Sequence, residues 1–190
     1  MEIFTLVTGV IYIILEIRQK NLMWVVGVVT SLAAMYVFFL QGLYGSFGLN
    51  LYYFIMSFWG LWTWKRQKDS LSAGKAGEDA VHLNRMTRKV FVSSMLMVVF
   101  GTVLLAWLMR LLDDPMSYLD AAVAVLSAVA TWWLGRSYLE QWWLWILADM
   151  MSAVLCLTMG MWWMTVLYVM YALSAVYGLY YWKRKGVYLN

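Results

Sequence analysis

The sequence has one cysteine, one proline and one histidine among its 190 residues. A single cysteine cannot form an intrachain disulfide, and it rules out a metal site built from several cysteines. Cys156 lies within an apolar stretch, where we interpret it as a small packing residue. We therefore expect no metal ion and no cofactor.

Charge is also scarce in this chain. Only 13% of the residues are charged and 64% are hydrophobic, whereas a soluble domain carries about 25% charged residues. The apolar stretches are continuous and close to the ~20 residues that a membrane-spanning helix needs. They lack the alternation over about ten residues that marks a membrane β-barrel. The composition predicts an all-α integral membrane protein. Its net charge of +4 does not indicate a nucleic-acid partner, because the basic residues fall where cytoplasmic loops are expected.

Seven apolar stretches predict seven transmembrane helices, at residues 3–17, 23–40, 46–64, 90–109, 117–134, 141–158 and 161–182. The one long polar connection, 65–89, carries seven of the 14 lysine and arginine residues, and we expect it to lie in water. Its histidine, His82, is too distant from other candidate ligands or bases to support catalysis. We assign this loop no function.

The basic residues also predict the orientation of the helices. With 65–89 in the cytoplasm, 13 of the 14 lysine and arginine residues lie on the cytoplasmic side, and only Arg110 lies outside. Cytoplasmic loops of membrane proteins are enriched in such residues. We predict a multi-pass protein of the bacterial inner (cytoplasmic) membrane, with an extracytoplasmic N-terminus and a cytoplasmic C-terminus.

An internal repeat relates the two ends of the chain at a constant offset of 118 residues. The matched positions include Arg18 and Arg136, Trp24 and Trp142, Gly42 and Gly160, Tyr53 and Tyr171, and Gly60 and Gly178. Three helices in each repeat with one helix between them give a 3+1+3 parallel repeat. This is the arrangement of the SWEET-like sugar transporters, with the substrate expected at midplane between the halves. The predicted division is 1–66 for the first repeat, 67–116 for the cytoplasmic loop and linker helix, and 117–190 for the second repeat.

Asp149 is the strongest candidate site residue. It lies near the middle of the apolar stretch 141–158, where a carboxylate costs roughly 2.5–3.5 kcal/mol to insert. Trp142 and Trp145 precede it at a spacing that puts all three on one helical face. Two indole rings beside an anion suit a flat, positively charged organic molecule. The repeat mate of Asp149 is Ser31, so only one half carries the charge. A single ligand site on the pseudo-axis between the halves needs only one anion.

These three residues also have structural interpretations. A buried carboxyl can be protonated or hydrogen-bonded to a neighbour, although the predicted helices offer no basic partner at comparable depth. Tryptophan is common at membrane interfaces in any case. Glu16 and Asp120 lie near helix ends, and we interpret both as boundary charges that reach water.

Two further pairs are candidates for the opposite wall of the site. Asn50 lies one turn before Tyr53 and can fix a polar edge of a ligand, or it can form an interhelical hydrogen bond. Their repeat mates are Tyr168 and Tyr171, which would face the same central cavity.

Two segments resemble the PnuC family of vitamin transporters. Residues 43–64 resemble the family's third helix, with the pattern Leu43-Tyr44-Gly45, Asn50, Tyr53, Ser57 and Trp59-Gly60-Leu61-x-x-Trp64. Residues 142–149 resemble the family's Trp-x-x-Trp-x-x-x-Asn motif, with Asp149 in place of asparagine. The rest of the chain is similar in helix order and repeat plan.

The resemblance implies a uniporter that takes up a small vitamin by facilitated diffusion, with a cytosolic kinase trapping the vitamin by phosphorylation. Members carry nicotinamide riboside, thiamine or riboflavin. Asp149 for asparagine and Asn50 for glutamine depart from the riboside pattern, and a carboxyl suits the aminopyrimidine of thiamine. Thiamine is therefore the favoured cargo and nicotinamide riboside the alternative. Riboflavin is the least favoured cargo, because its ring is neutral and carries no positive charge to offset the burial of an ionised Asp149. No second midplane acid suggests itself, so we expect no ion coupling.

Two other classes of function fit the sequence less well. An intramembrane enzyme needs a serine with a histidine, paired aspartates or a metal cluster. The predicted helices contain no histidine and one mid-depth aspartate, so we expect no enzymatic activity and assign no catalytic residue. A non-transporting membrane receptor would need neither a midplane charge nor two pseudo-equivalent halves. Long apolar faces allow a homo-oligomer in the bilayer, and the sequence leaves the oligomeric state open.

Overall fold

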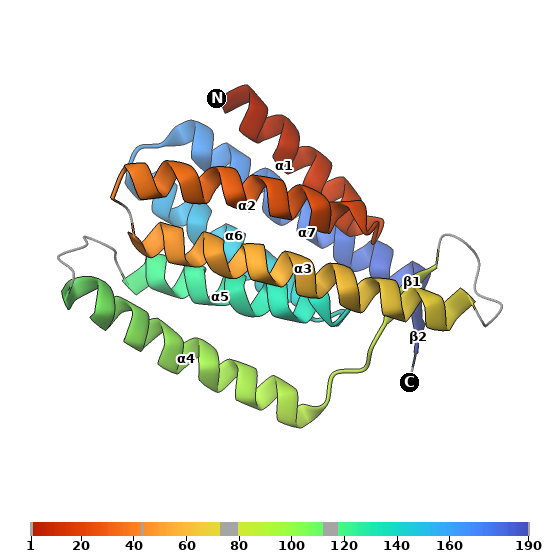
Figure 1. The fold of residues 1–190 in the computed structure, drawn as a ribbon. Coiled ribbons are helices and arrows are strands. Elements are labelled where there is room, and N and C mark those ends of the chain that lie inside the picture. The colour runs from red at the N-terminus through yellow and green to blue at the C-terminus, as the bar shows by residue number, and fades with distance from the viewer. Residues whose placement is uncertain (1, 43, 73–79, 112–117, 190) are drawn as a thin grey trace. The chain divides into compact units, whose positions relative to one another are not determined.

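The structure is a computed structural model that describes residues 2–42, 44–72, 80–111 and 118–189. Within these ranges the side chains of residues 2–8, 44 and 69–72 are not described, and Leu43 of the family-like motif lies outside them. The described residues form seven α-helices and two short strands (Figure 1). The helices are α1 (Glu2–Ile17), α2 (Leu22–Leu40), α3 (Tyr44–Ser72), α4 (Arg88–Leu111), α5 (Tyr118–Gly135), α6 (Gln141–Thr158) and α7 (Trp162–Lys185), and the strands are β1 (Val81–Leu83) and β2 (Gly186–Tyr188).

The prediction of an all-α membrane protein is confirmed. Five of the described helices, α2, α4, α5, α6 and α7, are long and apolar enough to cross a membrane. The other two predicted spans differ for separate reasons. Helix α1 has 16 residues, and α3 contains Asn50 and several tyrosines that lower its hydropathy. Helix α3 also continues to Ser72, beyond the predicted stretch 46–64, so its charged last turns extend the helix past the apolar segment.

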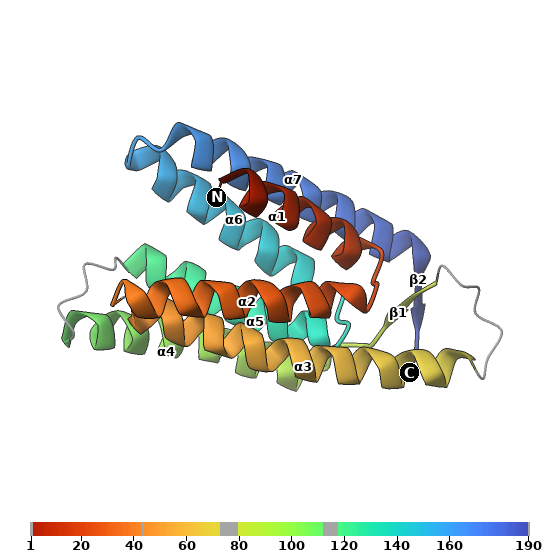
Figure 2. The same ribbon diagram turned by 45° about the horizontal axis from the view of Figure 1, so that its top comes forward.

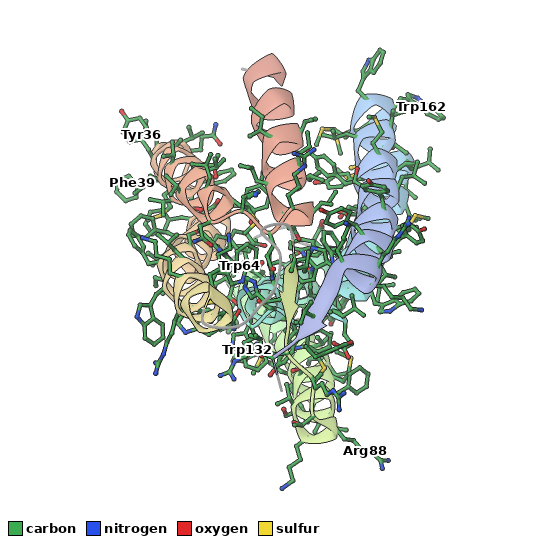
Figure 3. All side chains as sticks on the ribbon, turned by 90° about the vertical axis from the view of Figure 1, so that its right-hand side faces the viewer. Tyr36, Phe39, Trp64, Arg88, Trp132 and Trp162 are labelled. Atoms are coloured by element: carbon green, nitrogen blue, oxygen red, sulfur yellow. The ribbon has the colours of Figure 1, made fainter. Side chains whose placement is uncertain are left out.

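The chain forms two compact units. The first comprises residues 1–85, 134–139 and 180–190, and the second comprises residues 86–133 and 140–179. In the first unit α2 lies alongside α3, as both views show (Figures 1 and 2). Trp64 of α3 lies in the interior of this unit, whereas Tyr36 and Phe39 of α2 point outward (Figure 3). In the second unit α6 lies alongside α7 (Figure 2).

In the second unit α4 packs against α5. Trp133 Nε1 donates a hydrogen bond to Ser94 Oγ at 3.1 Å, and both side chains are buried. Gly101 of α4 lies against Val125 of α5, where the absence of a side chain lets the two helices approach closely. The opposite face of α4 carries exposed apolar residues such as Phe100 and Trp107, as expected for a helix that contacts lipid.

Several local features recur at the predicted offset of 118 residues. Gly42 ends α2 with φ +71° and Gly160 ends α6 with φ +72°, a left-handed conformation that glycine adopts without strain. Gln19 and Ser137 also match at this offset, and both have positive φ values, 49° and 57°. These are agreements of local conformation at matched positions. The 3+1+3 arrangement of the two halves stays a prediction.

The same offset relates two tryptophan–glycine contacts. The Trp24 indole of α2 fills the space beside Gly60 of α3, and the Trp142 indole of α6 fills the space beside Gly178 of α7. A Cβ atom built on either glycine would lie 2.4 Å from the nearest ring carbon. Each glycine is therefore the position that lets a buried tryptophan bring two helices together.

We expect Gly60→Ala and Gly178→Ala to destabilise the protein by similar amounts. The added methyl group has no room because Trp24 and Trp142 are only 1% and 2% exposed, and overpacking of this kind costs about 1–3 kcal/mol. Gly48→Ala is the matched control, because Gly48 is an exposed helical glycine with nothing within 4 Å of its added Cβ. Thermal unfolding in detergent measures the effect. Equal stability of Gly60→Ala and Gly48→Ala would show that the indole can move aside.

A buried polar cluster in the first unit joins segments that are far apart in the sequence, and we call it the Gln19 junction, made of Gln19, Gln67, His82 and Ser137. The Gln19 side chain accepts from the His82 N–H at 2.8 Å and donates to the His82 carbonyl at 3.0 Å. It also donates to Ser137 Oγ at 3.2 Å, and Ser137 Oγ donates to Gln67 Oε1 at 2.8 Å. Gln19 and Ser137, repeat mates by sequence, are thus hydrogen-bonded to each other.

Further bonds tie the ends of the helices to this junction. Trp64 Nε1 donates to the Leu134 carbonyl at 3.1 Å, and Trp182 Nε1 donates to the Ile17 carbonyl at 2.9 Å. The strand β1 pairs in parallel with β2 near the end of the chain. The junction therefore links the last turns of α1, α3, α5 and α7 with the segment that precedes α4.

The expectation that all of residues 65–89 lie in water is wrong for β1. Val81, His82 and Leu83 are each at most 1% exposed. Their backbone groups need no water because β2 and the Gln19 side chain satisfy them. His82 is thus a buried structural residue, and its ring lies edge-on to the Trp64 indole at a centroid distance of 6.0 Å.

We expect stability to fall as the pH drops from 6.5 to 4. Burial, with Lys68 nearby as a smaller cause, lowers the pKa of His82 from 6.5 to about 4. The unfolded state therefore binds more protons across that window, and the free energy of unfolding decreases by up to roughly 3 kcal/mol as pH falls. Because His82 is the only histidine, His82→Leu should remove most of the change in melting temperature between pH 7 and pH 5. An unchanged pH dependence in that variant would contradict this assignment.

Candidate functional site

The predicted site residues divide between the two units. Five lie in the second unit, on α6 and α7, namely Trp142, Trp145, Asp149, Tyr168 and Tyr171. Asn50 and Tyr53 lie on α3 in the first unit. The convergence of all seven on one cavity stays a prediction.

Helix α6 places Asp149 in an apolar setting. The helix begins at Gln141, ends before Gly160, and buries one face formed by small and apolar side chains. Asp149 and Trp145 are half-buried on this face, whereas Trp143 is 61% exposed. A charged side chain partly withdrawn from solvent on an apolar helix is a candidate functional group because its insertion has to be offset by a specific partner.

Asp149 lies within electrostatic range of two tyrosines of the neighbouring helix. The carboxylate is close enough to the Tyr168 and Tyr171 hydroxyl groups to interact electrostatically with both. The two tyrosine rings lie edge-on to each other with centroids 6.1 Å apart. Three of the predicted residues, an acid and two phenols, thus lie within electrostatic range of one another in the second unit.

Two residues near this group were not among the predicted site residues. Asp120 of α5 and Cys156 of α6 also interact electrostatically with the Tyr168 hydroxyl group. Asp120 is half-buried in the first turn of α5, which is compatible with the predicted boundary charge. An acidic residue in the first turn of a helix is common for local reasons, so its position alone did not indicate a role in the site.

The two tryptophans differ in their surroundings. The Trp142 ring is buried against Gly178 of α7, so much of its surface serves helix packing. The Trp145 ring is half-buried, and its buried Nε1–H has no hydrogen-bond acceptor among the described residues. Trp145 is therefore the better candidate for a ring that stacks on a ligand.

The candidates on α3 are also half-buried. Asn50 Nδ2 donates to the Ser46 carbonyl of its own helix at 2.9 Å, so one of its two N–H groups serves α3. Tyr53 lies beside Tyr52, with ring centroids 5.8 Å apart.

A second acid and phenol group occurs in the first unit. Glu16 is 5% exposed, so the prediction that it is a boundary charge reaching water is wrong. The Tyr12 hydroxyl group interacts electrostatically with both Glu16 and Tyr53. Glu16 and Tyr12 are one helical turn apart, a spacing that could have indicated the pair. Among the described residues, no group of three or more histidine, cysteine, aspartate or glutamate side chains could hold a metal ion.

Comparison with known proteins identifies the family. The family model described as nicotinamide mononucleotide transporter matches residues 1–184. The nicotinamide riboside transporter PnuC of Neisseria mucosa is 27% identical over 193 residues, covering 94% of this chain and 70% of that protein. Those of Haemophilus influenzae and Escherichia coli are 22% and 26% identical, covering 94% and 77% of this chain and 76% and 69% of theirs.

A solved structure shares the fold. The crystal structure of the vitamin B3 transporter PnuC superposes with a TM-score of 0.72 and 25% sequence identity, covering 95% of this chain and 79% of that one. The resemblance to the PnuC family inferred from residues 43–64 and 142–149 is confirmed, and so is the expectation that the chain is not an enzyme. The protein is a multi-pass membrane transporter, and it belongs to the nicotinamide mononucleotide transporter family, together with the PnuC nicotinamide riboside transporters.

Proposed function

We propose that this protein carries nicotinamide riboside across the membrane by facilitated diffusion. The relatives from three bacterial genera are named nicotinamide riboside transporters. The observation that carries the proposal is the half-buried Asp149, with Tyr168 and Tyr171 of α7 within its electrostatic range.

The riboside has chemistry that matches this group. Its pyridinium ring carries a permanent positive charge, which the Asp149 carboxylate can neutralise. The Trp145 indole can stack on the flat ring and add a cation–π attraction. The Tyr168 and Tyr171 hydroxyl groups can bond the ribose hydroxyls or the carboxamide. The contribution of Asn50 and Tyr53 of α3 to this site stays a prediction from the sequence.

The mononucleotide in the family's name fits this site less well. A phosphate adds about two negative charges near pH 7, and these would be repelled by Asp149 at close range. The proposed site residues include no lysine or arginine that could offset them. We therefore propose the riboside as cargo.

Thiamine is the second candidate. The sequence favours thiamine because Asp149 stands where the family motif has asparagine. The relatives do not support that preference, since they are named for the riboside. Asp149 remains the observation in favour of thiamine, because a carboxyl can pair with the ring nitrogen and amino group of its aminopyrimidine.

The proposed transport cycle has no energy coupling of its own. The vitamin enters from outside, binds at Asp149, and leaves when the halves 1–66 and 117–190 rock against each other. A cytosolic kinase then traps it by phosphorylation. The proposed cycle assumes that the protein lies in the bacterial inner membrane with its C-terminus in the cytoplasm. The basic residues predict this orientation.

A counterflow assay tests the proposal. Proteoliposomes loaded with unlabelled nicotinamide riboside should take up labelled riboside, and an imposed pH or sodium gradient should not drive accumulation. The mononucleotide and riboflavin, each used as the internal ligand, should not support uptake. Counterflow with thiamine alone would reassign the cargo, and no counterflow with any of these ligands would contradict a transporter of this class.

A further inference from the structure

Gln141, the first residue of α6, is a buried polar residue whose side chain has no hydrogen-bond partner among the described residues. Its side chain is 0% exposed. Neither its amide nitrogen nor its amide oxygen is hydrogen-bonded within the part of the chain that the structure describes. A buried polar group left unpaired lowers stability by about 1–3 kcal/mol, so a second role has to favour glutamine here.

Packing alone does not require glutamine at this position. Its repeat mate at the offset of 118 residues is Met23, the second residue of α2, which is also 0% exposed. Methionine has a similar length and no polar group to satisfy. The other half of the protein therefore fills the matching position with an apolar side chain.

Gln141 lies on the same face of α6 as the proposed site. Gln141, Trp145 and Asp149 follow one another at intervals of four residues, which puts them in one row along the helix. With a rise of 1.5 Å per residue, the row spans about 12 Å from Gln141 to Asp149. Trp145, in the middle of the row, also has an unpaired buried polar atom, Nε1.

We propose that Gln141 is a specificity-determining residue that hydrogen-bonds the uncharged polar end of the substrate, the ribose hydroxyls in the case of nicotinamide riboside. Asp149 holds the charged ring, Trp145 stacks between the two, and Gln141 receives the far end of the molecule. This inference rests on the proposed function, because it assigns one more contact in the same site. It also explains why a buried amide has no hydrogen-bond partner among the described residues.

Gln141→Met, which copies the residue of the other half, tests the inference by two measurements. Without ligand, the variant should melt at a higher temperature than the wild type, because it no longer buries an unpaired amide. Its Kd for nicotinamide riboside, measured by quenching of tryptophan fluorescence, should rise roughly five- to tenfold through loss of the hydrogen bond. Gln41→Met is the matched control, because Gln41 is exposed at the end of α2 and should change neither value.

A merely structural glutamine would give the opposite pattern. If Gln141→Met melts earlier than the wild type or does not fold, the amide has structural partners and the inference is wrong. An unchanged Kd in the folded variant overturns it as well, while the proposed function stands because the wild type still binds. Wild-type protein that binds neither nicotinamide riboside nor thiamine removes the proposed function and this inference together.

Discussion

Replacing Asp149 with alanine should abolish measurable binding of nicotinamide riboside. The carboxylate is the group on α6 that can neutralise the ring charge, and it lies beside Tyr168 and Tyr171. Removing one partner of a desolvated charge pair costs about 2–5 kcal/mol, which corresponds to a roughly thirty- to several-thousandfold rise in Kd. Titration of purified protein followed by tryptophan fluorescence measures this change.

Two further variants test whether the loss of binding comes from the charge of Asp149. Asp149→Asn keeps the shape and restores the residue of the family motif, so it should weaken thiamine binding more than riboside binding. Ser31→Ala alters the repeat mate, which carries no charge, and should change either affinity less than threefold. Unchanged riboside affinity in Asp149→Ala would exclude this carboxyl from the site.

Replacing Gln19 with leucine should cause a large loss of stability. The Gln19 side chain satisfies the buried N–H and carbonyl of His82 and bonds Ser137 Oγ. Each buried group left without a partner costs about 1–3 kcal/mol, so the free energy of unfolding should fall by roughly 2–5 kcal/mol. For a chain of this size this corresponds to a melting temperature lower by about 4–20 °C. Gln41→Leu is the control at an exposed glutamine, and equal melting temperatures for the two variants would contradict the account of the junction.

The Gln19 junction also constrains the proposed transport cycle. It joins the ends of α1, α3, α5 and α7, which belong to both sequence halves. In the proposed cycle, rocking of the halves therefore has two possible effects. Either the junction stays intact and acts as a pivot, or its hydrogen bonds break and the ends of these helices separate. Exchange rates of nicotinamide riboside distinguish these outcomes. A folded Gln19→Leu variant should exchange at the wild-type rate if the junction is a pivot, and faster if the junction is a gate.

The helices and the family were predictable because their signals are local and strong. Long apolar runs indicate membrane-spanning helices by their length alone. The residues matched at the offset of 118 also contact each other in equivalent pairs, Trp24 with Gly60 and Trp142 with Gly178. The pairing of Asp149 with Tyr168 and Tyr171 was predictable in part, since helix periodicity fixes the face of each residue.

The buried strand and the buried acid were not predictable from local patterns. Val81, His82 and Leu83 sit in a polar stretch, and they are buried because a glutamine 63 residues earlier satisfies the backbone of His82. Glu16 lies two residues before Arg18, which is typical of a helix end in water, yet tertiary packing buries it beside Tyr12. The partner of the His82 backbone is brought close by the fold, and no local spacing reveals it. The spacing of Tyr12 and Glu16 indicates a pair on one helical face, but it does not indicate that the pair is buried.

The most direct test of the central claim is a binding titration of the purified wild-type protein against nicotinamide riboside, nicotinamide mononucleotide, thiamine and riboflavin, read by quenching of tryptophan fluorescence. The account predicts saturable binding of nicotinamide riboside, weaker binding of thiamine, and no binding of the mononucleotide or of riboflavin. Tight binding of the mononucleotide or riboflavin, with no response to either cationic vitamin, would contradict it.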